Sequence, residues 1–387
     1  MKRSALLFGA LMLGAASGAN AQALTMQMSN GWTFGFAGNV NIFAQFQSQS
    51  KSGTTPGGLV GSGGKGFYYG TGLLPSFSTF TAKGKEGNTD LGVQFGFAPQ
   101  VQCGGGRHDC FGGEFSGASI DMRQVFMTVG GSWGMITAGR ELGVYQRQNI
   151  LNDQTLFGVG GGGIAPRGTT LGRIGFGYIY PNFVAQMTYT TPAGRPGSLS
   201  IGLMDPSTFG PYDTHLIPRL EAEGSYKSGN ILVFASGTVQ NSKTAPSGGT
   251  SKTAYGAAGG VTYKSGTFSL HGSGYYGRGV GTTLMFGDAG VDANGLTKSL
   301  GFFGQLTFTP ANSKTTFAGS YGSSFLKASS SSDKIENTLI SAGIYHQATK
   351  SLKLVGEGDY MWSKIKPAGG TTKNKAFTGA FGLMLFY

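Results

Sequence analysis

The sequence has few charged residues and no long apolar run beyond its N-terminus. Only 12% of its 387 residues are Asp, Glu, Lys or Arg, which is about half the share found in soluble proteins. No later stretch approaches the roughly 18 apolar residues that a membrane-spanning helix needs. These two absences argue against both a charged soluble protein and a helical membrane protein.

Catalytic and metal-binding motifs are also scarce. The four His residues are scattered, without an H-x-x-x-H pair, and no G-x-S-x-G occurs. The stretch "GVGGGG" matches G-x-G-x-x-G in letters, but it opens no helix and is interpreted as a flexible loop. The sequence therefore predicts no enzyme active site and no cofactor.

The first residues predict export from the cytoplasm. Lys2 and Arg3 precede the apolar run "ALLFGALMLGAA", and the small residues of "ANAQA" follow. This order is typical of a cleaved signal peptide over residues 1–21, with cleavage after Ala21 as the first choice and after Ala23 as the second. The formal net charge is +12, of which the signal peptide holds two.

The two cysteines lie seven residues apart in "CGGGRHDC". In an oxidising compartment, Cys103 and Cys110 are expected to form a disulfide. A zinc site using these cysteines and His108 is disfavoured, because a closed structural site needs four ligands.

Glycine and aromatic residues are abundant, with 71 Gly, 28 Phe and 16 Tyr. Many segments alternate apolar with small or charged residues, as in "WTFGFAGNVNIFAQF" and "SLKLVGEGDYMW". This period of two indicates β-strands with one apolar and one polar face. A secreted Gly-rich sandwich is one interpretation. A membrane barrel is favoured, because the segments are about 9–12 residues long, end in aromatics and carry full charges on the polar face.

The predicted fold class is all-β: a transmembrane antiparallel β-barrel of about 16 strands over residues 22–387, with short and long connections in alternation. The predicted strands are 32–47, 76–83, 90–99, 119–130, 134–141, 172–181, 183–191, 218–228, 231–241, 254–264, 267–279, 298–309, 315–325, 335–346, 351–363 and 377–387.

The C-terminal stretch "FTGAFGLMLFY" has no charge and alternates to its last residue. Its strand is expected to pair with the first strand, because an unpaired edge in lipid is costly. The tail resembles the C-terminal targeting strand of outer-membrane proteins, although Tyr stands where Phe is usual and Ala380 where a polar residue is common. The predicted targeting residues are Phe381, Leu383, Leu385 and Tyr387.

The stretches "RQVFMTVGGSWGMITAGRELGVY" and "RIGFGYIYPNF" resemble the trimeric general diffusion porins of Gram-negative bacteria. The resemblance implies a homotrimer whose third loop, near residues 142–171, folds into the lumen as a constriction. Two features depart from the family. The first strand lacks its frequent Y-G-x-x-D, and "SFSTFTAKG" has no Arg in the second strand.

The resemblance implies basic wall residues opposite acidic loop residues. Arg140 and Arg173 match the wall positions, and five basic against two acidic groups predict a mild preference for anions. Glu221, Glu223, Glu357 and Asp359 are also expected to face inward, but on strands far from the loop root. The candidate constriction residues are Arg123, Arg140, Arg147, Arg167, Arg173, Asp153 and Glu141.

The expected function is passive diffusion of small hydrophilic solutes and ions through the outer membrane. A substrate-selective channel for sugars or organic anions, a surface adhesin and a barrel enzyme are the alternatives. Inward Phe43, Phe234, Tyr275 and Phe303 are a weak sign of a sugar path. The expected partners are outer-membrane lipid, lipopolysaccharide and solutes, and the export signal argues against nucleic acid.

Overall fold

The structure of the protein is a computed structural model. It describes residues 24–50, 58–61, 63–101, 120–161, 168–286, 290–292, 295–329, 333–366 and 370–387.

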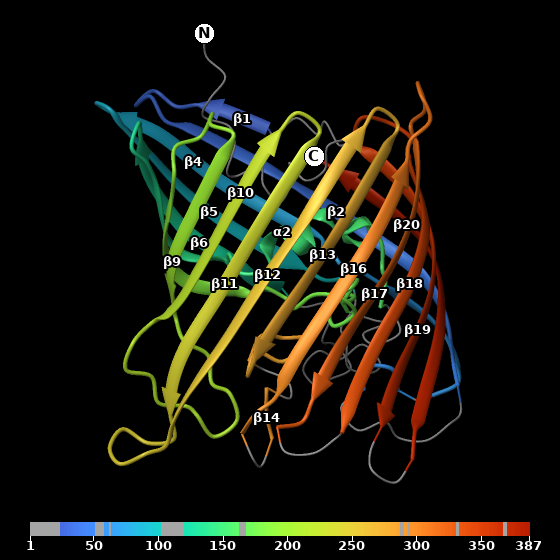
Figure 1. The fold of residues 1–387 in the computed structure, drawn as a ribbon. Helices are drawn as coiled ribbons and strands as arrows, with labels where there is room; N and C mark the ends of the chain where they lie inside the picture. The colour runs from blue at the N-terminus through green and yellow to red at the C-terminus, as the bar shows by residue number, and fades with distance from the viewer. Residues whose placement is uncertain are drawn as a thin grey trace, which may run out of the picture.

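Sixteen antiparallel strands form a closed barrel (Figure 1). Each strand pairs with the next along the chain, and the last strand, β20, pairs with the first, β2, so that the ring has no free edge. Closure gives every strand a partner on both sides, as a barrel in lipid requires. The strands are β2 (Thr33–Gln49), β4 (Phe77–Glu86), β5 (Thr89–Pro99), β6 (Ile120–Gly131), β7 (Gly134–Leu142), β8 (Phe183–Thr190), β9 (Gly197–Met204), β10 (Arg219–Ser228), β11 (Ile231–Lys243), β12 (Ser251–Ser265), β13 (Phe268–Arg278), β16 (Lys298–Phe308), β17 (Thr315–Lys327), β18 (Lys334–Gln347), β19 (Leu352–Lys366) and β20 (Thr372–Phe386).

Four short strands complete the sheet structure. The 17 residues of β2 pair with β20 along one edge, and with β4 and then β3 (Lys65–Gly70) along the other. β1 (Leu24–Gln27) pairs with the start of β2, and β14 (Val291–Asp292) pairs with β15 (Gly295–Leu296). Figure 1 places β1, the C-terminus and the tight hairpin turns at one end of the barrel, called here the short-turn end, and the longer connections at the other, the long-loop end.

The side chains of the strands alternate between the two faces of the wall. On β20, the side chains of Phe377, Phe381 and Leu383 are exposed on the outside, whereas Asn374 and Thr378 are buried inside. An apolar outer face and a polar inner face are the pattern of a membrane barrel.

The C-terminal residue closes the barrel. The backbone N–H and C=O of Tyr387 pair with the C=O and N–H of Gly38 at 3.0 and 2.9 Å. Its hydroxyl lies 2.7 Å from the Ser78 hydroxyl, and its ring centroid lies 5.1 Å from that of Phe36. The predicted pairing of the last strand with the first is therefore confirmed.

The predicted strand count is confirmed although two assignments were wrong. Residues 172–181, predicted as a strand, form turns inside the barrel, with positive φ at Gly175 (+81°) and Gly177 (+147°). The apolar side chains of this segment pack in the interior, where the alternation looks the same as that of a lipid-facing strand. Instead β9 supplies the missing strand, in a range that the sequence assigned to a long loop.

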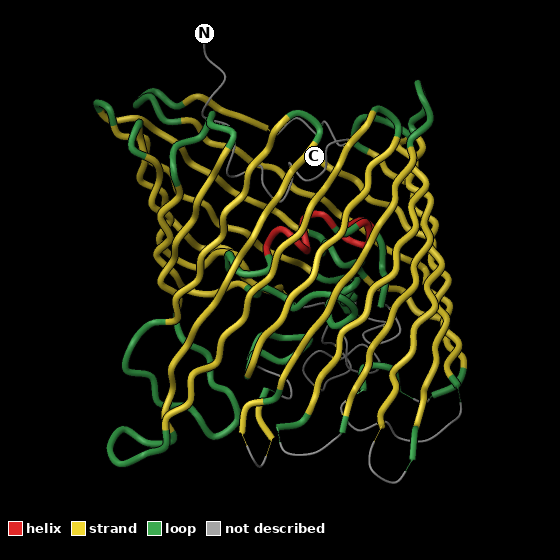
Figure 2. The backbone as a smooth tube through the Cα atoms, in the orientation of Figure 1, coloured by secondary structure: helices red, strands yellow, loops and turns green. Residues whose placement is uncertain are grey.

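A long segment between β7 and β8 enters the barrel. It contains α2 (Arg147–Asn152) and the 3-10 turn η1 (Gln154–Phe157), which Figure 2 shows in red within the ring of strands. Among the described residues, no helix is both long and apolar enough to cross a bilayer. The described residues of this segment, 143–161 and 168–182, are called the constriction loop below.

Candidate functional site

The root of the constriction loop is held by a carboxylate of the barrel wall. Oε2 of Glu221 on β10 accepts the backbone N–H groups of Val144 and Tyr145 at 2.9 and 3.0 Å. Oε1 of Glu221 lies 3.0 Å from Nε of Arg219, and both side chains are buried. A buried charge is tolerated when it is paired and hydrogen-bonded in this way. Glu221 is therefore an anchor for the loop.

The helix α2 is fastened to the next inward residue of β10. Nη2 of Arg147 lies 2.7 Å from Oε1 of Glu223, and Nε2 of Gln148 donates to the same oxygen at 3.3 Å. The Arg147 side chain is 14% exposed and that of Glu223 is 4% exposed. Their charges therefore offset each other close to the wall.

The turn after α2 is organised by Asp153. Its Oδ1 accepts the N–H of Thr155 at 3.0 Å, and its Oδ2 accepts the hydroxyls of Thr155 and Tyr178 at 2.6 and 2.9 Å. Nε of Arg173 lies 3.9 Å from the carboxylate. Burial, and next the Asp153 charge, raise the pKa of Tyr178 well above its usual value. Tyr178 therefore stays protonated as a donor, and Asp153 acts as a structural acceptor.

Arg173 fastens the returning part of the loop to the opposite wall. Its guanidinium donates to the backbone C=O of Leu339 at 3.0 Å and to the hydroxyl of Ser320, and it lies 5.8 Å from the ring centroid of Phe303. The side chain is 0% exposed. Arg173 therefore belongs to the inserted loop rather than to the barrel wall, which corrects its predicted position, and its side chain is buried away from the water of the lumen.

The second part of the loop is anchored by Glu357 on β19. Its Oε1 accepts the N–H groups of Val159 and Gly160 at 2.7 and 2.6 Å, while its Oε2 accepts the Tyr345 hydroxyl at 2.7 Å. Six strands separate β19 from β10 along one side of the barrel. The loop is therefore held across the lumen by carboxylates on two distant parts of the wall.

Residues 58–61 of the first loop also enter the lumen. The N–H of Leu59 donates to Asn337 at 3.0 Å, the N–H of Val60 donates to Ser363 at 2.8 Å, and Asn374 donates to the C=O of Val60 at 3.0 Å. Val60 packs in a buried cluster with Phe176, Leu339, Met361 and Ala376. This part of the interior is filled with apolar side chains.

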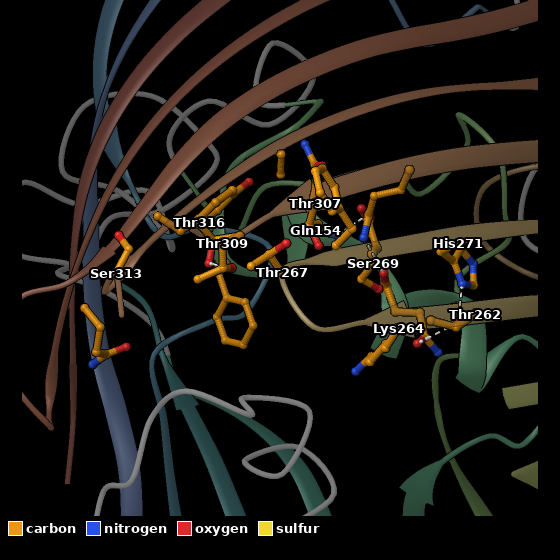
Figure 3. Close-up of a pocket in the computed structure, with 18 of the residues that line it drawn as sticks. Gln154, Thr262, Lys264, Thr267, Ser269, His271, Thr307, Thr309, Ser313 and Thr316 are labelled. Atoms are coloured by element: carbon orange, nitrogen blue, oxygen red, sulfur yellow. Dashed lines mark hydrogen bonds between the residues drawn. The ribbon is translucent and has the colours of Figure 1, made fainter. Parts of the chain in front are cut away.

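A polar cavity of about 530 Å³, called here the inner basin, lies on the short-turn side of the loop (Figure 3). Its floor includes Leu151 and Phe157 of the loop, and its walls come from β12 to β19. Nζ of Lys353 lies 3.8 Å from the ring centroid of Phe157. Hydroxyls and cations dominate the lining, with Thr262, Thr267, Ser269, Thr307, Thr309 and Thr316 among the hydroxyls and Lys264, Lys314 and Lys353 as the lysines.

A second cavity of about 340 Å³ lies on the other face of the loop. This cavity is lined by Ile150 and Leu156 of the loop. The residues that follow them in the sequence, Leu151 and Phe157, line the inner basin instead. The charged lining residue of the second cavity is Arg123, whose Nε lies 2.8 Å from the Asp121 carboxylate. The constriction loop therefore separates two compartments of the lumen.

Several predicted site residues lie elsewhere than expected. Arg140 is exposed on the outer face of β7, opposite Val125 and Ala185, so it is not a lumen-facing wall residue. Glu141 faces inward and accepts a hydrogen bond from Gln124 at 2.7 Å. Arg167, Cys103 and Cys110 lie outside the described residues, so the predictions made for them stay predictions.

The inward acidic residues of β10 and β19 were expected to lie far from the loop root, and this expectation was wrong for Glu221 and Glu223 of β10. Glu221 and Glu223 contact its first residues, and Glu357 contacts residues 159–160. The signal was present in "LEAEGSY" and "LVGEGDYMW", where acids alternate on the inner face. Acids placed on the inner face at mid-strand need partners, and backbone N–H groups and side chains of the loop supply them. Within the described residues no group of three or more His, Cys, Asp and Glu is placed to hold a metal ion.

Comparison with known proteins agrees with this architecture. A family model described as Gram-negative porin matches residues 8–365. A search of curated proteins found no match. Among solved structures, the outer membrane channel DcaP of Acinetobacter baumannii aligns with TM-score 0.67 and 15% identity, covering 94% of this chain and 99% of that one. The anion-selective porin from Comamonas acidovorans aligns with TM-score 0.63 and 14% identity, over 92% and 100% of the chains. A trimer form of OmpT of Vibrio cholerae aligns with TM-score 0.58 and 13% identity, again over 92% and 100%.

Proposed function

The chain belongs to the family of Gram-negative porins, and on this premise we propose that it conducts small hydrophilic solutes and ions passively, with a mild preference for anions. It is an outer-membrane protein, and its barrel is the channel. A barrel of this strand number can enclose an aqueous passage. The observation that carries the proposal is the loop pinned across the lumen, with a polar basin beside it.

The proposed anion preference arises from the basin rather than from the loop arginines. Arg147 and Arg173 are paired with Glu223 and Asp153, and Arg140 lies outside the barrel. The basin is lined by three lysines and by one carboxylate, Asp153, whose oxygens already accept three hydrogen bonds. None of these lysines forms an ion pair within the described part of the chain. Rings of like charge set ion preference in channels.

Replacing Lys264, Lys314 and Lys353 together with Gln is expected to shift the reversal potential toward cation preference. The shift should be larger in dilute salt, because the screening length falls from about 30 Å at 0.01 M to about 3 Å at 1 M. The measurement is the zero-current potential of purified protein in a planar bilayer under a salt gradient.

The matched control replaces Lys85, Lys227 and Lys350 with Gln. These three lysines are exposed at the short-turn end of the barrel but do not line the basin. It removes the same charge and should leave the potential near the wild-type value. A cation-selective wild type, or equal shifts in both variants, would contradict the proposed origin of selectivity.

A substrate-selective channel is the second candidate, favoured by the hydroxyl-rich wall of the basin. The aromatic path considered from the sequence gives it no support, because Phe43, Phe234, Tyr275 and Phe303 are at most 3% exposed. Liposome swelling separates the candidates: a selective channel gives rates that saturate with one solute, whereas a general pore gives rates that follow solute size. The family to which the chain belongs consists of channels without catalysis, so no observation favours a barrel enzyme. No observation within the described residues favours a surface adhesin either.

A homotrimer is part of the proposal. It is supported by the barrel fold that this chain shares with a protein described in a trimer form.

The cleaved signal peptide over residues 1–21 is also proposed, and N-terminal sequencing of the mature protein would test it. The proposed partners are a second and third copy of the chain, outer-membrane lipid with lipopolysaccharide, and small solutes.

The disulfide between Cys103 and Cys110 remains a proposal with a direct test. Folded, unreduced protein should give negligible labelling by a thiol reagent, whereas reduced protein should label at both cysteines. Reduction should cost little stability, because the loop that the bond closes is only about eight residues long and the entropy of closing a short loop is small. Full labelling without reductant would show that the pair does not form.

A further inference from the structure

Five cations form a continuous row on the outside of the barrel, called here the rim row. Register pairs Arg278 with Lys298, Lys298 with Lys327, Lys327 with Lys334, and Lys334 with Lys366. The row therefore crosses five adjacent strands, β13, β16, β17, β18 and β19, without a gap. Each member is the first or last residue of its strand at the long-loop end.

The rim row faces outward. Lys298 lies on the same face of β16 as the exposed side chain of Leu300, and Lys366 lies on the same face of β19 as that of Tyr360. The other members share this outer face, because directly paired residues lie on one face of a sheet. The four lysines are exposed, and no member forms an ion pair within the described part of the chain. Nε of Arg278 is buried without a hydrogen-bond partner. Like charges directly opposite each other destabilise a sheet, so the row is suited to an external anion.

Most residues next to the rim row are apolar or aromatic. Two residues along each strand from the row, the outward positions are Tyr276, Leu300 and Phe325 on β13, β16 and β17, and the oppositely charged pair Glu336 and Lys364 on β18 and β19. One step further, Trp362 contacts Nζ of Lys373 at 4.6 Å from its ring centroid. Aromatics at this position mark the edge of the hydrocarbon region. The row therefore lies where lipid headgroups meet the wall.

We propose that the rim row binds the phosphate groups of lipid A, the glycolipid of the outer leaflet. The proposal rests on the proposed function for one point, that the long-loop end faces the cell exterior. Phosphate oxygens accept charge-assisted hydrogen bonds from Lys and Arg, and each basic residue near an anionic lipid surface adds to the attraction. A line of cations across five strands can contact several headgroups side by side.

The first test uses the wild-type protein and two forms of one lipid. Purified protein is titrated with fluorescent bisphosphorylated lipid A and with the same lipid after removal of both phosphates, at two salt concentrations. Binding of the phosphorylated form should be at least about tenfold tighter and should weaken with salt, as phosphate contacts to several lysines require. Equal binding of the two lipids would overturn the proposal, as would equal binding of phosphatidylglycerol and bisphosphorylated lipid A.

The second test locates the site. Changing Lys298, Lys327, Lys334 and Lys366 to Gln should weaken binding of bisphosphorylated lipid A at least about tenfold. The control changes Lys85, Arg195, Lys227 and Lys350 to Gln, which removes the same charge at the other end of the barrel. Equal losses in the two variants would overturn the assignment to the rim row. Channel conductance is measured on the same samples, so loss of lipid binding with normal conductance is distinguished from failure of the channel itself.

Discussion

Replacing Tyr387 with Asp is expected to remove most of the assembled barrel from the outer membrane. The backbone of this residue closes the ring against Gly38, and its ring lies beside that of Phe36 on the outer face. A charged side chain on the lipid face of a barrel costs up to about 2–4 kcal/mol, depending on depth. The measurement is the amount of heat-modifiable protein in outer-membrane fractions, compared with degraded chain in the periplasm.

The matched control is Tyr387→Phe, which keeps the ring and the backbone pairing. It loses only the contact of the hydroxyl with Ser78, so assembly should remain near the wild-type level. Normal assembly of the Asp variant would contradict both the closing role and the targeting role of the last strand.

Replacing Glu221 and Glu357 together with Ala is expected to release the constriction loop and raise single-channel conductance and current noise. Each carboxylate accepts two consecutive backbone N–H groups of the loop. Hydrogen bonds to a charged group are worth about 1.5–3 kcal/mol each, so each anchor contributes several kcal/mol before solvation by lumen water is counted. Loss of both should let the loop leave its position across the lumen.

Two further variants test whether the anchors act through the loop. Glu357→Gln keeps an acceptor oxygen and should give an intermediate conductance. Glu336→Ala removes a carboxylate on the outer side of β18, where Trp362 donates to it at 3.1 Å, and should leave conductance unchanged. An unchanged conductance in a folded double variant would show that other contacts, such as those of Arg173, hold the loop by themselves.

The anchors bear on the proposed ion preference of this protein. Acidic residues that would favour cations in an open lumen are occupied by loop N–H groups and arginines. The lysines of the inner basin line its cavity and form no ion pair within the described residues. Residues 58–61 fill a further part of the lumen at the long-loop side, so the passage is narrowed by two inserted segments rather than one.

Much of the wall could be predicted from the sequence because its signal is local. A strand of a membrane barrel alternates with a period of two wherever it lies, and the uncharged tail at Tyr387 follows from its contact with lipid. The inserted loop was expected only through the resemblance of its flanking motifs to a family. Arg140 shows the limit, because its face depends on register, and a shift of one residue moves a side chain to the other side of the wall.

The period-two pattern and the uncharged tail were enough to predict an all-β membrane barrel whose last strand pairs with the first. The pattern could not show that residues 172–181 lie in the interior instead of facing lipid, because apolar side chains alternate in the same way in both places. The fold also sets the role of Glu221 and Glu357, whose partners in the constriction loop lie 76 to 198 residues away along the chain. Burial removes these carboxylates from water, so their role is set by whichever N–H groups the fold brings to them, and local sequence does not encode that choice.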